Sequence, residues 1–136
     1  MKKIILSLIM SAIIISACSK AVLPEQKEDT GTKNSYTKIS QDEAKKMMEK
    51  DDGHVIVDVR REDEFASGHI PGAILIPNES IGTEKPAELP DLDQIILVYC
   101  RSGNRSAQAS QKLADLGYTN VFDFGGIMTW TGEIEK

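Results

Sequence analysis

The residues best suited to carry out a reaction are a cysteine, two arginines and a glycine within residues 100–106, Cys-Arg-Ser-Gly-Asn-Arg-Ser. Before them, residues 94–99 are nearly all apolar and rich in β-branched side chains, which predicts a strand buried on both faces of a parallel sheet. After them, residues 106–116 carry apolar side chains at helical spacing, and Gly117 provides a helix stop. We therefore expect Cys100 at the end of a strand, facing the N-terminus of a helix.

This junction predicts a cradle for an anion, because loop amides and a helix N-terminus would both direct positive charge toward Cys100. Gly103 permits the unusual backbone dihedral angles that such a loop needs. The same charges favour the thiolate over the thiol, so we expect Cys100 to be a nucleophile at neutral pH. The alternative is a small buried apolar residue at a strand end, which is common for free cysteine. The predicted cradle consists of Arg101, Ser102, Gly103, Asn104, Arg105 and Ser106.

A second polar cluster, Asp58 and Arg60, comes at the end of the strand predicted for residues 54–59. Strands alternate with helices along the chain, which predicts an α/β fold with a central, mostly parallel sheet and helices on both faces. Sites in such sheets lie beyond the C-terminal strand ends, so Asp58 and Arg60 are expected near Cys100. Arg60 either braces its loop through an ion pair with Asp58 or contacts the substrate.

The other elements expected from the pattern are mostly short. His54, at the start of its strand, is interpreted as a solvated polar residue. The remaining expectations, in chain order, are an edge strand at residues 36–39, a capping box at 40–43 that opens a helix ending at 51–53, a helical turn at 60–66, a strand at 74–76, a surface connection at 78–93, a strand at 120–124, and a Gly125-Gly126 turn into a short helix that holds Trp130.

The N-terminal segment has the pattern of an export signal. Lys2 and Lys3 precede an apolar run at residues 4–15, and Ser16 and Ala17 form a small-residue cleavage site. The apolar run is shorter than the roughly 20 residues that a membrane-spanning helix needs. Residues 18–35 are mostly polar and are predicted to be a flexible tether. The chain thus divides into a signal at 1–17, a tether at 18–35 and a folded domain at 36–136.

Residues 15–18, Ile-Ser-Ala-Cys, resemble the lipobox of bacterial lipoproteins. The resemblance implies cleavage before Cys18, acylation of its sulfur and its new amine, and attachment to a membrane. Several buried acyl chains hold a protein durably on a lipid surface. We therefore expect an exported protein anchored to the bacterial cell envelope, on its periplasmic or extracytoplasmic face.

Charge and cysteine content exclude several other classes of function. The net charge is −5, and it becomes −7 without Lys2 and Lys3, which argues against nucleic acid as a partner. If Cys18 carries lipid, Cys100 is the single remaining thiol, so neither an intramolecular disulfide nor a C-x-x-C redox pair can form. The two histidines are far apart in the sequence, and nothing resembles a metal site.

Four motifs in this order resemble the single-domain rhodaneses, a family of thiosulfate sulfurtransferases. They are Asp58-Val59-Arg60 with Glu64-Phe65, the Gly-His-Ile-Pro-Gly-Ala stretch at 68–73, the loop at 100–106, and Gly125-Gly126 with Trp130. The resemblance covers about residues 36–130. It implies that the Cys100 thiolate takes the outer sulfur of thiosulfate, releases sulfite and passes the sulfur from a persulfide to a thiol or to cyanide. The amides of residues 101–105 would hold the persulfide, the Arg101 and Arg105 side chains would attract the donor, and no cofactor is implied.

Two alternatives stay open at this point. Cysteine-dependent phosphatases and arsenate reductases place an arginine after five intervening residues, whereas this chain has Ser106 there and Arg105 after only four. The smaller loop favours sulfur over phosphate. A carrier or docking module that holds a persulfide without turnover is the other alternative, and an intact Cys100 is compatible with both a carrier and an enzyme.

Overall fold

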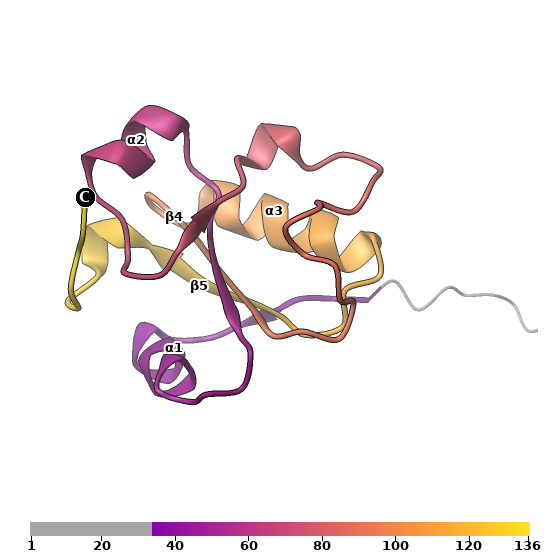
Figure 1. Ribbon diagram of the computed structural model, residues 1–136, viewed down its shortest axis with the longest axis horizontal. Helices are drawn as coiled ribbons and strands as arrows, with labels where there is room; N and C mark the ends of the chain where they lie inside the picture. The colour runs from indigo at the N-terminus through magenta and orange to yellow at the C-terminus, as the bar shows by residue number, and fades with distance from the viewer. Residues whose placement is uncertain (1–33) are drawn as a thin grey trace, which may run out of the picture. The chain divides into compact units, whose positions relative to one another are not determined.

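The computed structural model describes residues 34–136, which form a five-stranded sheet in the order β1-β5-β4-β2-β3 (Figure 1). All neighbouring strands are parallel, as the sequence predicts. The predictions for the signal segment, for Cys18 and for most of the tether lie outside the described residues. In chain order the elements are β1 (Thr37–Lys38), α1 (Gln41–Met48), β2 (Val55–Asp58), α2 (Glu62–Ser67), β3 (Ile74–Leu75), the 3-10 turn η1 (Asn78–Ser80), β4 (Ile96–Cys100), α3 (Asn104–Asp115), β5 (Val121–Gly126) and the 3-10 turn η2 (Ile127–Thr129).

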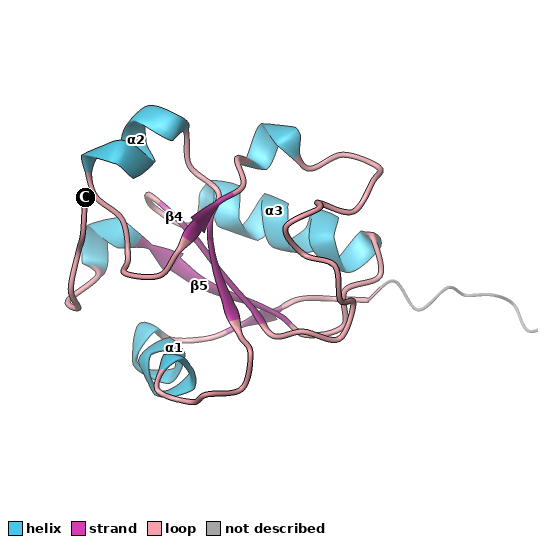
Figure 2. Ribbon diagram, viewed as in Figure 1, coloured by secondary structure: helices cyan, strands magenta, loops and turns pink. Residues whose placement is uncertain are grey.

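The helices cover both faces of the sheet, with α1 on one side and α3 on the other (Figure 2). Side chains of the central strand β4 alternate between two cores because successive residues of a strand point to opposite faces. Val98 and Cys100 pack in the core that contains Leu113 of α3, whereas Leu97 and Tyr99 pack in the core on the α1 side. Every residue of β4 is buried, as expected for a central strand of a parallel sheet.

The predicted capping box forms at the start of α1. The Ser40 hydroxyl accepts a hydrogen bond from the Glu43 N–H at 3.1 Å, and the Glu43 carboxylate accepts one from the Ser40 N–H at 2.8 Å. Ala44 is fully buried in the core on this face. The helix ends at Met48, earlier than the sequence indicates, and Glu49 caps it with a hydrogen bond from its N–H to the Lys45 carbonyl at 3.2 Å.

Two expectations at the strands are wrong. His54 is not freely solvated, because its side chain is only 17% exposed and its Nδ1 lies 2.7 Å from Asp52 Oδ1. Gly125 and Gly126 do not form a turn. They belong to β5, whose end pairs with Cys100 across a shift in register. Trp130 accordingly follows η2 and is not held within a helix.

Candidate functional site

Cys100 is the last residue of β4 and is almost fully buried, at 1% exposure. Its Sγ accepts a hydrogen bond from the Gly103 N–H at 2.9 Å. Gly103 has a φ of +108°, in the left-handed region that favours glycine, and it is the N-cap of α3. The sulfur therefore lies at the positive end of a 12-residue helix, where negative charge on it is stabilised. This arrangement suits a nucleophilic thiolate that carries a transferred group.

The helix begins earlier than the sequence indicates. α3 begins at Asn104, so Arg105 and Ser106 lie in its first turn and the loop after the cysteine is reduced to residues 101–103. The Ser106 side chain is buried, and its hydroxyl donates to the Gly103 carbonyl at 3.0 Å. Ser106 thus fixes the N-cap residue whose amide binds the sulfur.

The end of β5 packs closely against the backbone of the loop at residues 101–103. A Cβ added to Gly126 would lie 2.1 Å from the Arg101 carbonyl oxygen and 2.7 Å from the Ser102 Cα, which no side chain could tolerate. The Met128 N–H donates to the same Arg101 carbonyl at 3.2 Å. Gly126 is therefore required for the close approach of the two backbones. The sequence contains it as a motif residue, but its partner could not be identified without the fold.

Three of the six cradle residues are on the surface. Arg101, Ser102 and Asn104 are exposed. Within the described part of the chain, the Arg101 guanidinium forms neither a hydrogen bond nor an ion pair. It is thus available to attract an anion that approaches the loop.

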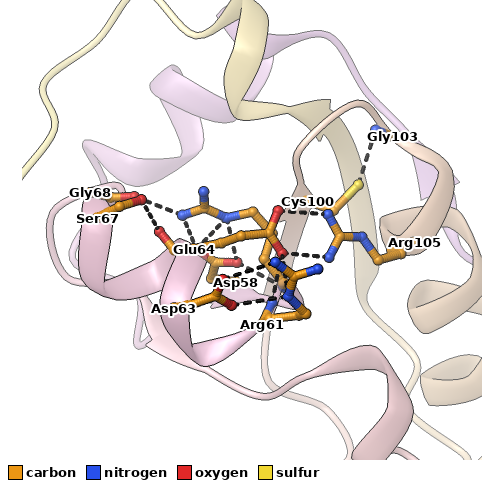
Figure 3. Close-up of polar contacts among 10 residues, drawn as sticks. Asp58, Arg61, Asp63, Glu64, Ser67, Gly68, Cys100, Gly103 and Arg105 are labelled. Atoms are coloured by element: carbon orange, nitrogen blue, oxygen red, sulfur yellow. Dashed lines mark hydrogen bonds and ion pairs between the residues drawn. The ribbon is translucent and has the colours of Figure 1, made fainter.

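Arg105 differs from the expectation that both guanidinium groups face an incoming anion. Its Nη1 and Nη2 donate to Glu64 of α2 at 2.7 and 3.0 Å, a two-bond ion pair (Figure 3). The Arg105 hydrogen bonds lower the pKa of Glu64 to about 2, so the carboxylate is charged at neutral pH. In turn, the hydrogen bonds to Glu64 are the main cause of the raised pKa of Arg105.

Asp58 and Arg60 bind each other instead of the cysteine loop. Arg60 Nη2 lies 2.7 Å from Asp58 Oδ2, and its Nε is 3.0 Å from both carboxylate oxygens. Nη2 also donates to the Gly68 carbonyl at 2.7 Å, which ties the end of β2 to the end of α2. The pair is buried and its donors are used within the fold, so its geometry is that of a brace.

Other features of the described residues do not add to this site. Two hollows of about 350 Å³ lie elsewhere, one beside His54 and Trp130 and one beside Pro77 and Glu84, and Cys100 lines neither. Residues 34–136 contain no group of three His, Cys, Asp or Glu side chains placed to hold a metal ion. Over the same residues, none of the helices has the length and apolar character to cross a membrane.

Comparison with known proteins identifies relatives of this site. A family model described as a rhodanese-like domain matches residues 40–133. The chain is 35% identical over 71 residues to thiosulfate sulfurtransferase PspE of Escherichia coli, with 52% of this chain and 68% of that protein covered. It is 37% identical over 91 residues to adenylyltransferase and sulfurtransferase UBA4 of Meyerozyma guilliermondii, with 61% of this chain but only 21% of that protein covered.

A solved structure is similar over most of its length. The rhodanese-like domain protein from Staphylococcus aureus has 34% sequence identity and a TM-score of 0.62, with 73% of this chain and 96% of that chain covered. The two relatives above are named sulfurtransferases, which supports sulfur transfer as the general chemistry. These matches confirm the resemblance that the motifs carry: the chain belongs to the rhodanese-like domain family.

Proposed function

We propose that this protein is a thiosulfate sulfurtransferase that works through a persulfide on Cys100. The observation that carries the proposal is the 2.9 Å hydrogen bond from the Gly103 N–H to the sulfur at the N-terminus of α3. Such a donor stabilises negative charge both on the attacking thiolate and on the persulfide that replaces it. The name of the Escherichia coli relative supports thiosulfate as the donor.

The reaction consists of two sulfur exchanges. In the first, the Cys100 thiolate forms a bond to the outer sulfur of thiosulfate, and the original sulfur–sulfur bond breaks with its electron pair leaving on sulfite. In the second, cyanide or a thiolate attacks the outer sulfur of the Cys100 persulfide. The electron pair of the cysteine–sulfur bond then returns to Cys100, and thiocyanate or a persulfide of the acceptor leaves. Two half-reactions of this kind predict ping-pong kinetics.

The first half-reaction is tested by incubating the purified protein with thiosulfate and measuring its intact mass. We expect one added sulfur atom on the wild type and none on Cys100→Ser, and an unchanged mass for both would refute the proposal. Adding cyanide to the isolated persulfide form should return the mass to its starting value, and cyanide together with excess thiosulfate should give repeated release of thiocyanate. A single release without turnover would identify a persulfide carrier instead of an enzyme.

The phosphatase alternative has no support at position 106. Ser106 is buried with its hydroxyl bonded to the Gly103 carbonyl, and the nearby guanidinium of Arg105 is bound to Glu64. An anion in the loop would therefore not meet an arginine at the position where those enzymes have one. Hydrolysis of an aryl phosphate, lost in Cys100→Ser, would overturn this assignment.

We also propose that the protein is exported and anchored through lipid on Cys18 to the bacterial cell envelope, on its periplasmic or extracytoplasmic face. This proposal rests on the sequence of residues 1–18 alone. Metabolic labelling with a radioactive fatty acid tests it. Labelling should be lost in Cys18→Ala and retained in Cys100→Ala, and equal labelling of Cys18→Ala would exclude the anchor.

A further inference from the structure

Glu64 is the one carboxylate that forms an ion pair with an arginine of the cysteine loop or of the first turn of α3, among the described residues. It reaches Arg105 from α2, across a separation of 41 residues in sequence. Both side chains are partly buried, at 18% exposure for Glu64 and 27% for Arg105. The contact is therefore shielded from water on most sides, and each charge cancels much of the other's field at the loop.

This pairing changes the charge that an incoming donor meets. The residue types alone suggest two guanidinium groups facing a dianion, whereas the structure leaves only Arg101 without a carboxylate partner in the described part of the chain. Cys100 attacks as a thiolate, so the incoming donor meets a negative charge. That charge repels a dianion twice as strongly as a monoanion.

We propose that Glu64 is a specificity-determining residue that tunes this site toward sulfur donors with one negative charge, namely thiosulfonates and organic persulfides, relative to thiosulfate. This inference rests on the sulfurtransferase function proposed above. With a thiosulfonate, the Cys100 thiolate bonds to the terminal sulfur, the bond to the sulfonyl sulfur breaks, and its electron pair leaves on a sulfinate. The same Cys100 persulfide results, so only the charge of the donor and of its leaving group differs.

Glu64→Gln removes the charge and keeps the local structure. Glu64 is the third residue of α2, where its Oε2 accepts a hydrogen bond from the Arg61 N–H at 3.0 Å. Glutamine serves equally well at this position of a capping box, because its side-chain oxygen accepts the same bond. Glu62→Gln is the matched control, since it removes the same charge from the same helix at an exposed residue with no ion pair among the described residues.

The experiment compares thiosulfate with methanethiosulfonate, which has the same tetrahedral sulfur and the same transferable sulfur but one negative charge fewer. Cyanide is the acceptor, and kcat/KM is measured for each donor at low and at high ionic strength. We expect the ratio of kcat/KM for thiosulfate to kcat/KM for methanethiosulfonate to be about fivefold higher in Glu64→Gln than in the wild type at low salt. This is the effect of one charge acting over roughly 8 Å at an effective dielectric constant of about 40. The increase should shrink at high salt, and it should be absent in Glu62→Gln.

Arg105→Gln supplies an independent test in the opposite direction. In this variant Glu64 keeps its charge but has no partner, which should lower the same ratio of kcat/KM. This test stays available if Glu64→Gln does not fold. An unchanged ratio in Glu64→Gln, or a raised ratio in Arg105→Gln, would overturn the role of Glu64 while leaving sulfur transfer intact. Failure of both donors to place sulfur on Cys100 of the wild type would instead overturn the proposed function itself.

Discussion

Two arginine–carboxylate pairs lie at the C-terminal edge of the sheet, and they differ in burial and in what they connect. Asp58 and Arg60 are two residues apart and have exposed fractions of 0% and 6%. Glu64 and Arg105 are 41 residues apart, join α2 to α3, and remain partly open to solvent. Both pairs have several hydrogen bonds.

The difference separates a structural pair from a tuneable one. A charge in the interior is tolerated only with its partner, so losing either member of the Asp58/Arg60 pair leaves an uncompensated buried ion. Water reaches part of the Glu64/Arg105 pair, so changing one member costs less. A substitution in the Glu64/Arg105 pair can therefore change the charge near the cysteine loop while the protein stays folded.

Asp58→Asn should have the largest effect on stability. Arg60 would stay buried without a counter-ion, and such losses cost about 3–5 kcal/mol in the free energy of unfolding. Urea denaturation of the purified protein measures this change. Replacing both residues, as in Asp58→Asn with Arg60→Met, should recover part of the loss, because no unpaired charge remains. If Asp58→Asn alone is as stable as the wild type, the two pairs do not differ in their contribution to stability.

The same conservative substitution at both arginines sharpens the comparison. Lysine keeps the charge but lacks the planar fork, so Arg60→Lys loses the bond to the Gly68 carbonyl together with part of the contact to Asp58. We expect a loss of about 2–3 kcal/mol for Arg60→Lys and about 1 kcal/mol for Arg105→Lys in unfolding free energy. Thermal or urea denaturation of the two variants side by side gives the ranking. The reverse ranking would contradict it.

The pattern of residues predicts the sheet and the position of Cys100 because both depend on local signals. An apolar run marks β4, and the following polar loop with Gly103 marks its end. The apolar spacing predicts too late a start for α3 because Asn104 and Arg105 carry no apolar periodicity, although their backbone is helical. Apolar spacing reports which apolar side of a helix is buried, and among residues 104–106 the first turn of α3 buries only the polar side chain of Ser106.

The errors at the site come from contacts that only the fold creates. The sequence shows Glu64 as a motif residue and predicts no role for it, because its partner is 41 residues away and meets it only when α2 lies beside the first turn of α3. Two consecutive glycines normally indicate a turn, but Gly126 is a strand residue here since its missing side chain lets the loop backbone pass. The sequence places Cys100 at the end of a strand, and the fold determines which charges surround it.

Acid titration should reveal the Glu64/Arg105 pair as an intermediate case. The pKa of Glu64 is about 2 in the folded protein, below its ordinary value of 4.5, so the carboxylate stabilises the fold fully above about pH 4.5. That contribution, on the order of 1 kcal/mol for a partly exposed pair, is lost as the pH falls from 4.5 toward 2. The difference in unfolding free energy between the wild type and Glu64→Gln should shrink over this window. A difference in unfolding free energy that stays constant over this pH window would mean that Arg105 does not lower the pKa of Glu64.

The smallest effect is expected at a third pair, Arg61 with Asp63, which has the same chemistry without burial. Arg61 Nη2 lies 2.8 Å from Asp63 Oδ2, yet their side chains are 65% and 68% exposed. Water and salt screen such a pair, and ordering two long side chains offsets most of the attraction. Arg61→Gln should therefore leave both the denaturation midpoint and sulfur transfer unchanged within error. Since Arg61 and Asp63 lie between Arg60 and Glu64 in sequence, a measurable loss there would show that charge at this edge, and not burial, determines how much each arginine contributes.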